Sequence, residues 1–245
     1  MVVKQRLDVV VAERNLAESR SKALALIIAG SIELNGVVVT KAGTPVSSDD
    51  VITRIELNPY VSRGGLKLAS ALNLFPVSCE HKICMDIGAS TGGFTDYLLQ
   101  HGAVKVYAID VGHAQLHWKL RNDPRVVVME GVNFRYFSPD LLKDSVQFVT
   151  IDVSFISLDK ILPVLPRCVS AGGDVIAMVK PQFEMSRAEV KHGVVRDDQL
   201  RATAINRIRD VAHTYGFTVA GGVDSEVKGP KGNIEHFLWL QNRAR

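Results

Sequence analysis

A short apolar run followed by a glycine-rich turn is the feature that most constrains the fold of this 245-residue chain. Residues 82–87 read Lys-Ile-Cys-Met-Asp-Ile, as a buried strand would. Gly88, Gly92 and Gly93 follow, and residues 94–99 have the pattern of a helix start. Glycine permits a tight turn and a close approach of backbone to ligand. Open α/β sheets bind ligands at the carboxyl ends of their strands, so this turn is expected to be a binding loop.

Three functional interpretations of this loop compete, beside that of a purely structural turn. The dinucleotide pattern G-x-G-x-x-G fails, because Ser90 stands in place of its second glycine. Residues 88–92 do match G-x-S-x-G, the nucleophile elbow of α/β-hydrolases. An elbow normally follows several strands, however, and only one small domain precedes this loop. The glycine-rich loop of an S-adenosylmethionine methyltransferase fits best, with Asp86 before the turn and Asp110 closing the next predicted strand.

Composition places the chain in the ordinary globular class, with 47% hydrophobic residues. A net charge of +3 is compatible with a nucleic-acid partner but does not demand one. No apolar stretch is long enough to span a bilayer, and Lys4, Arg6 and Asp8 interrupt any signal-peptide core. The three cysteines lack C-x-x-C spacing, which favours reduced thiols in the cytoplasm. The histidines form no ligand pattern, so no metal is expected.

The amino-terminal segment, residues 1–57, predicts a small α+β domain. Residues 6–15 and 19–30 have the apolar spacing of two short helices, the second capped by Ser19. Residues 32–39 form two strands about Asn35-Gly36, a dipeptide that suits the tight turn of a hairpin. Val51 to Leu57 then predicts a closing strand, and residues 58–62 a linker.

Two helices followed by a hairpin resemble the RNA-binding domain named after ribosomal protein S-four. The resemblance lies in Arg6-Leu7-Asp8, Ser19-Arg20, residues 23–30 and Leu34-Asn35-Gly36-Val37. In that family the basic residues around the helices meet RNA phosphates. The alternative is that such residues are ordinary solvated charges on helix surfaces. The resemblance implies an RNA-binding set of Arg6, Arg20, Lys22 and, at the start of the next domain, Arg63.

Residues 63–245 predict a Rossmann-like α/β domain with a seven-stranded mixed sheet, the layout of a class I methyltransferase. The predicted strands are 82–87, 104–109, 125–129, 146–151, 174–179, 217–223 and 234–240. Helical patterns separate several of them, at 94–100, at 157–169 and around 200–211, and another precedes Pro76. Such alternation argues for a doubly wound parallel sheet, here ending in a hairpin.

Four polar residues fall where this architecture would bring them together. Asp152 and Lys180 each follow a predicted strand, Glu235 lies in the last predicted strand, and Lys67 lies on the helix that enters the domain. A lysine that ends an apolar core strand is unusual, because lysine is rarely buried without a partner. With residues 88–93, 151–158, 179–184 and 232–237, these positions resemble the TlyA family. That family, historically called haemolysins, looks like ribosomal RNA 2′-O-methyltransferases with a catalytic domain similar to the FtsJ type.

The resemblance implies a methyltransferase that uses S-adenosylmethionine to modify the ribose of a ribosomal RNA cytidine, within a ribosomal subunit. Its catalytic tetrad would be Lys67, Asp152, Lys180 and Glu235. We expect Lys180 to accept the proton of the 2′-hydroxyl, beside Lys67 as a second cation, with the two carboxylates orienting both ammonium groups. The expected cofactor contacts are Asp86, Gly88, Ala89, Ser90, Thr91, Gly92, Gly93, Phe94, Asp110, Asn133 and Asp152.

Three other functions stay open at this point. An RNA-binding or ribosome-assembly factor could carry an inert methyltransferase-like domain. A serine hydrolase could use Ser90 with Asp152 and either His192 or His213. A membrane-lysing toxin, which the family's old name suggests, ranks lowest because the chain has no strongly basic amphipathic helix or spanning segment. The target nucleotide, the ribosomal subunit and the oligomeric state are not determined by the sequence.

Overall fold

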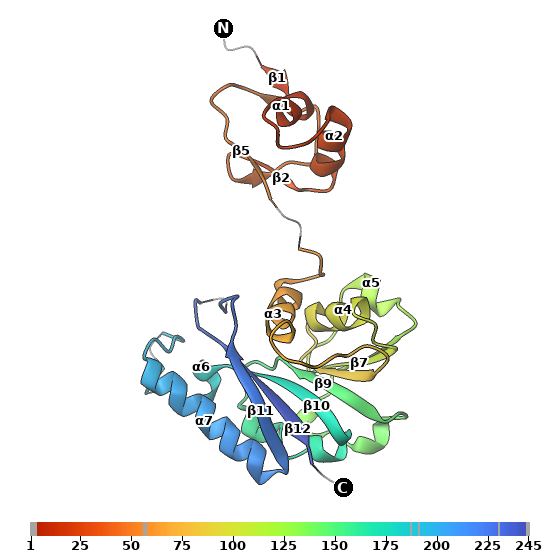
Figure 1. The fold of residues 1–245 in the computed structure, drawn as a ribbon, viewed down its shortest axis with the longest axis vertical. Coiled ribbons are helices and arrows are strands. Elements are labelled where there is room, and N and C mark those ends of the chain that lie inside the picture. Colours follow the sequence, from red (N-terminus) through yellow and green to blue (C-terminus); the bar gives the residue numbers. More distant parts are fainter. Residues whose placement is uncertain (1–3, 56–57, 187, 191, 230, 244–245) are drawn as a thin grey trace. The chain divides into compact units, whose positions relative to one another are not determined.

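The computed structural model describes residues 4–55, 58–186, 188–190, 192–229 and 231–243 (Figure 1). The chain divides into two compact units, Met1–Pro59 and Tyr60–Arg245. The division falls within residues 58–62, the segment expected to be a linker. Glu56 and Leu57, predicted to end a strand of the first unit, lie outside the described residues.

The amino-terminal unit is a small α+β fold around one apolar core. Its elements are β1 (Gln5–Arg6), α1 (Leu7–Glu13), α2 (Arg20–Ile28), β2 (Ile32–Leu34), β3 (Val37–Val38), β4 (Pro45–Val46) and β5 (Ile52–Arg54). β2 pairs antiparallel with β3 and β5. Positive φ at Asn35 and Gly36 gives the tight turn that joins β2 to β3, which confirms the predicted hairpin. The first helix begins at Leu7 because the backbone of Arg6 is extended and pairs with β4.

The carboxy-terminal unit is built on one seven-stranded mixed sheet, as predicted, and its strand order is β11-β12-β10-β9-β6-β7-β8. Its strands are β6 (Ile83–Ile87), β7 (Lys105–Asp110), β8 (Val126–Glu130), β9 (Val146–Ile151), β10 (Val169–Val179), β11 (Phe217–Asp224) and β12 (His236–Asn242). β12 is antiparallel to both of its neighbours, and the other neighbouring pairs are parallel. The last strand was predicted to include Glu235, but β12 begins at His236. Glu235 therefore immediately precedes β12.

Helices cover both faces of this sheet (Figure 1). The helices are α3 (Arg63–Leu72), α4 (Gly93–Gln100), α5 (Trp118–Arg121), α6 (Pro181–Glu184) and α7 (Asp198–Thr214). Leu68 of α3 and Leu98 of α4 belong to one apolar cluster with Phe148 and Phe237 of the sheet. Ile208 of α7 belongs to the cluster on the opposite face. Among the described helices, none combines the length and apolar character needed to cross a membrane.

The helix predicted over residues 157–169 is wrong. The structure has two single 3₁₀ turns there, Leu158–Lys160 and Leu165–Arg167. Pro163 and Pro166 lack the backbone N–H that a continuous α-helix needs, and the proline ring clashes with the preceding turn. Apolar spacing alone could not outweigh these two breaks.

The strand order determines where a ligand can bind. From β6 the chain moves outward through β7 to β8, and then crosses back to place β9 on the other side of β6. Such a reversal opens a crevice at the carboxyl ends of the strands on either side. The loops after β6, β7, β9 and β10 therefore meet at one edge of the sheet, and most of the predicted site residues lie on them.

Candidate active site

The loop after β6 depends on glycine at two positions. Gly88 has a φ of +85°, and a Cβ atom there would lie only 2.6 Å from the carbonyl oxygen of Asp152. Gly92 has a φ of +97°, and a Cβ atom there would overlap the side chain of Leu120. Glycine is therefore required at both positions by the left-handed backbone, and also by the close approach of the loop after β9 to Gly88 and of α5 to Gly92.

Asp110 joins the loops after β6 and β7. Its Oδ2 accepts a hydrogen bond from the Ser90 backbone N–H at 2.8 Å, and its Oδ1 accepts one from Gly112 at 2.7 Å. These bonds point the carboxylate along the edge of the sheet. They also hold Ser90 at a positive φ of 49°.

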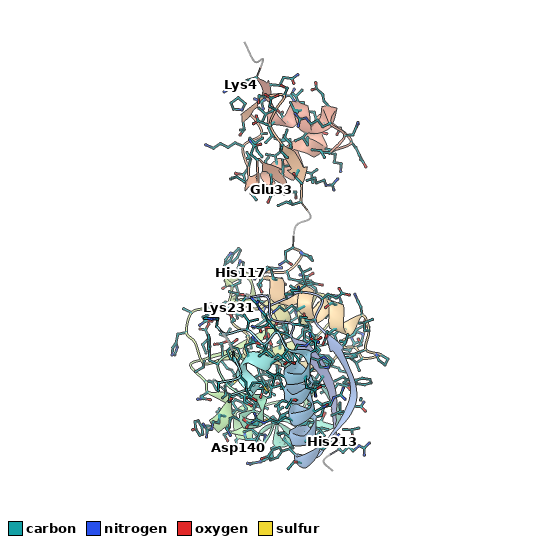
Figure 2. The ribbon with its side chains drawn as sticks, turned by 90° about the vertical axis from the view of Figure 1, so that its left-hand side faces the viewer. Lys4, Glu33, His117, Asp140, His213 and Lys231 are labelled. Carbon is teal, nitrogen blue, oxygen red and sulfur yellow. The ribbon has the colours of Figure 1, made fainter. Side chains whose placement is uncertain are left out.

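The hydrolase interpretation requires a histidine beside Ser90, and the structure does not provide one. Within the part of the chain that the structure describes, no imidazole is hydrogen-bonded to the Ser90 hydroxyl. His213 lies near the end of α7 and contacts the carbonyl oxygen of Phe217 at 3.1 Å. Figure 2 labels it at the end of the unit away from His117, the N-cap of α5. His192 is exposed on the segment before α7.

A cavity of about 480 Å³ opens at the ends of β6, β7 and β9. Of the predicted cofactor contacts, Gly88, Ser90, Asp110, Asn133 and Asp152 line it. Apolar side chains form most of the rest of its wall, among them Ile109, Val132 and Ile156, and Gln115 and Ser154 also line it. Its volume is typical of small-molecule sites. The chemistry fits S-adenosylmethionine, because apolar walls accept a flat purine and a fixed carboxylate accepts ribose hydroxyls.

The remaining predicted cofactor residues lie in an adjoining cavity, at the start of α4 and, for Asp86, in the core behind the loop. Ala89, Thr91, Gly93 and Phe94 line an adjoining cavity of about 340 Å³. Gly92 is the N-cap residue of α4.

Asp86 is fully buried and accepts hydrogen bonds from Thr95 at 2.7 Å and Thr150 at 3.0 Å. Burial raises its pKa to about 7, although both threonine hydrogen bonds favour the charged form. Asp86 lines neither cavity, so the structure places it behind the loop as a support and not in contact with a ligand.

The four tetrad residues form two buried ion pairs. Lys180 Nζ lies 2.6 Å from Asp152 Oδ1 and donates a hydrogen bond to Ser154 Oγ at 2.8 Å. Lys67 Nζ donates to Glu235 Oε2 at 2.5 Å. The side chain of Lys180 is only 9% exposed, and that of Lys67 only 11%.

All four tetrad residues line one cavity of about 450 Å³, here called the tetrad cavity. Asp152 also lines the 480 Å³ cavity described above, here called the cofactor cavity. Burying an ion pair adds little net stability, because dehydration offsets much of the attraction between the charges. Two such pairs in one cavity are therefore better explained by chemistry than by folding. Groups of this kind are typical of active sites.

Phe155 is a site residue that no pattern in the sequence indicates. Its side chain is 91% exposed, and its backbone has a positive φ of 64°, which is rare for an aromatic residue. Its ring lies 5.1 Å from that of Phe183, and it lines both the cofactor cavity and the tetrad cavity. Exposure and backbone conformation depend on tertiary structure, so periodicity could not have identified it.

Glu184 holds the segment of Phe155 in place. Its buried carboxylate accepts hydrogen bonds from Ser157 Oγ and from the Leu158 backbone N–H. Burial raises the pKa of Glu184, and the hydrogen bond from Ser157 opposes that effect. This contact fastens the loop after β9 to the turn that follows Lys180.

The predicted RNA contacts of the amino-terminal unit share one acid. Arg6 Nε donates to Asp8 Oδ1 at 2.9 Å, and Arg20 Nε donates to Asp8 Oδ2 at 2.8 Å. The hydrogen bond from Arg6 and, to a smaller extent, that from Arg20 lower the pKa of Asp8 against the effect of burial. Lys22 is exposed on α2. Arg63, in the other unit, is exposed and lines the 340 Å³ cavity with Lys67.

The sheet order, the glycine loop and the carboxylate that closes β7 define an S-adenosylmethionine-dependent methyltransferase. The FtsJ-like methyltransferase family matches residues 60–242, and the S4 domain matches residues 5–52. The chain therefore belongs to the FtsJ-like methyltransferase family and, within it, to the TlyA proteins.

Similarity to individual proteins extends over the whole chain. The chain is 43% identical over 247 residues to the "16S/23S rRNA (cytidine-2'-O)-methyltransferase TlyA" of Mycobacterium tuberculosis, a match that covers 100% of this chain and 92% of that protein. It is 46% identical over 238 residues to "Hemolysin A" of Brachyspira hyodysenteriae, covering 95% and 99% of the two chains. A solved structure, "Putative hemolysin from Streptococcus thermophilus", matches with a TM-score of 0.76 at 43% identity, covering 99% of this chain and 90% of that one.

Proposed function

We propose that this protein transfers the methyl group of S-adenosylmethionine to the ribose 2′-hydroxyl of a cytidine in ribosomal RNA. The observation that carries the proposal is the pair of buried lysine–carboxylate contacts in a cavity that adjoins the cofactor cavity. The names of relatives support the choice of substrate, since those from M. tuberculosis and Campylobacter jejuni are rRNA cytidine-2'-O-methyltransferases.

The proposed chemistry needs a proton acceptor near the substrate oxygen. When bound, S-adenosylmethionine supplies an electrophilic methyl group, but a ribose hydroxyl is a weak nucleophile until it loses its proton. Asp152 and Ser154 hold Nζ of Lys180 in the cavity wall, at the place where the proton would be taken. Lys67, oriented by Glu235, brings a second positive charge into the same cavity.

The proposed division of labour follows the two compact units. We assign RNA placement to the domain of residues 1–57, the linker to residues 58–62 and methyl transfer to residues 63–245. Arg6 and Arg20 present guanidinium groups that are more than half exposed, as phosphate contacts must be. Phe155 supports an RNA substrate too, because an exposed aromatic face beside the tetrad can stack on a base. Ribosomal RNA as substrate would place the protein in the cytoplasm.

Methyl transfer to stripped ribosomal RNA tests the proposal directly. The full chain, labelled S-adenosylmethionine and rRNA from a strain that lacks the enzyme should give label on the ribose of one or a few cytidines. A Lys180→Arg variant should give almost none, while Lys143→Arg, at an exposed position outside the site, should match the wild type. Cofactor binding in calorimetry without label in RNA from either subunit would overturn the proposal. Absence of cofactor binding would favour the inert assembly factor.

A further inference from the structure

Two loops meet beside the tetrad cavity and form a wall that the proposed reaction does not explain. One is residues 192–197, before α7, and the other comprises residues 225–229 and 231–235, between β11 and β12 (Figure 1). They line a further cavity of about 350 Å³. Lys231 lines both this cavity and the tetrad cavity, so the two cavities adjoin at that residue. Figure 2 labels Lys231 at the same end of the unit as His117 and at the opposite end from His213.

The wall is a fixed structure and not a pair of independent loops. Asn233 is only 4% exposed, and its Oδ1 accepts a hydrogen bond from the Val195 N–H at 3.0 Å. Its Nδ2 donates to the carbonyl oxygen of Gly193 at 2.9 Å. Gly193 has a φ of +79°, and a Cβ atom there would lie 3.0 Å from Lys231 Nζ. One buried amide thus joins the loops, and a glycine leaves room for the lysine to lie across them.

Three basic side chains line this further cavity: Arg196, Arg201 and Lys231, here called the basic wall. Arg201 Nη2 lies 3.5 Å from Asp198 and 3.6 Å from Asp224, and its Nε is buried with no hydrogen-bond partner among the described residues. Within the described part of the chain, neither Arg196 nor Lys231 has a carboxylate at ion-pair distance. Asp198 is the single acid that lines the cavity there. The wall therefore carries excess positive charge in a concave surface.

We propose that the basic wall binds the RNA phosphate backbone next to the methylated nucleotide, an inference that rests on the proposed function. The target ribose must reach Lys180, and the strand that leaves the tetrad cavity past Lys231 meets the wall directly. An arginine fork and a lysine ammonium both match phosphate oxygens. Contacts of this kind position a strand without reading its sequence. The cavity of the basic wall adjoins the tetrad cavity at Lys231, and the cavity that Arg63 lines adjoins it at Lys67. An RNA strand would therefore be held on both sides of the reacting ribose.

The test is the salt dependence of RNA binding by the full chain. The probe is ribosomal RNA stripped from subunits of a strain that lacks the methylation, titrated at several salt concentrations. An Arg196→Gln/Lys231→Gln variant should lower the slope of log K against log salt by roughly 0.7 to 0.9 for each phosphate that it no longer binds. The KM for RNA should rise by about tenfold at moderate salt, more than kcat changes. Affinity for S-adenosylmethionine should stay the same, because the wall does not line the cofactor cavity.

A matched variant controls for the removal of two charges. Lys143→Gln/Arg167→Gln removes the same charge from exposed positions outside the four cavities. If the slopes of the two double variants agree, the basic wall makes no phosphate contact and the inference is wrong. If the wild type binds RNA but methylates none, the proposed function fails instead, and the slopes still decide whether the wall binds phosphate. Arg201 is left unchanged because its Nη2 already lies near two carboxylates, 3.5 Å from Asp198 and 3.6 Å from Asp224.

Discussion

Both units hold basic side chains against carboxylates, but they expose them to very different degrees. In the amino-terminal unit, Arg6 and Arg20 flank the buried Asp8, and their side chains are 55% and 59% exposed. In the carboxy-terminal unit, the side chains of Lys180 and Lys67 are 9% and 11% exposed. The same pairing of opposite charges thus occurs once at the surface and once inside a cavity.

The difference in exposure separates binding from catalysis. At the surface, solvent and salt screen an ion pair, so Asp8 mainly fixes the direction of two arginines that can still meet phosphates. In the cavity wall, each lysine side chain is largely shielded from solvent and has one or two defined partners, which restricts the positions that its amine can take. Burial, and not the pairing itself, therefore distinguishes the two roles.

The largest expected effect is at Lys180. Replacement by alanine should lower turnover by about 10²- to 10⁴-fold, because general-base catalysis is worth that much. Arginine should not restore it, since a guanidinium stays charged and cannot take the proton. Single-turnover methylation would measure the decrease, with Lys143→Ala as the exposed control. Near-normal turnover of Lys180→Arg would mean that this residue only supplies charge, as Arg6 and Arg20 do.

Asp110 extends the comparison to a carboxylate whose partners are backbone N–H groups instead of cations. Asp110→Ala should weaken S-adenosylmethionine binding at least tenfold, because a hydrogen bond to a charged group is worth about 1.5–3 kcal/mol. RNA binding should change little. Calorimetry on the full chain provides the measurement, with Asp140→Ala as a control outside the cavities. Unchanged cofactor affinity would show that Asp110 does not contact S-adenosylmethionine.

At the surface the expected effect is smaller and depends on salt. Arg20→Ala should lower the slope of log K for RNA against log salt by roughly 0.7 to 0.9, the value for one phosphate contact. Cofactor affinity should not change, because Arg20 belongs to the other unit. Fluorescence anisotropy at several salt concentrations gives the slope. A decrease in affinity that is the same at every salt concentration would argue against a phosphate contact.

The smallest effect concerns Asp86, a buried acid without a cation. Its pKa is about 7 in the folded state, against an ordinary value of 3.8, so the folded state holds the proton more tightly. Stability that Asp86 contributes below about pH 4 is therefore lost as the pH rises toward 7. Asp86→Asn should flatten this decline relative to wild type. Both tryptophans, Trp118 and Trp239, lie in the carboxy-terminal unit, so urea unfolding followed by their fluorescence reports on it alone. A decline as steep as in wild type would contradict the raised pKa.

Local patterns in the sequence determined most of the architecture. Strand and helix periodicity depend on neighbouring residues, so the seven-stranded sheet could be predicted strand by strand. Glycine and asparagine mark backbone conformations that few other residues adopt, and this identified the Asn35-Gly36 turn and the loop from Gly88. Asp152 and Lys180 could be expected to lie close together because the carboxyl ends of parallel strands meet at one edge of a sheet. The full tetrad, with Lys67 and Glu235, was implied by the resemblance to the TlyA family.

Only the tertiary structure decided burial and partners. Asp86 and Asp110 both lie near the carboxyl ends of neighbouring strands, but Asp86 pairs with Ala108 and so lies further inside the sheet. Packing seals Asp86 against two threonines and leaves Asp110 lining a cavity. Phe155 is exposed because Glu184, distant in sequence, holds its segment in an unusual conformation. Ser154, the partner of Lys180, and Asn233, which joins the loops of the basic wall, are likewise defined by contacts over long sequence separation. Periodicity carries no information on such contacts, because they arise only when distant segments pack together.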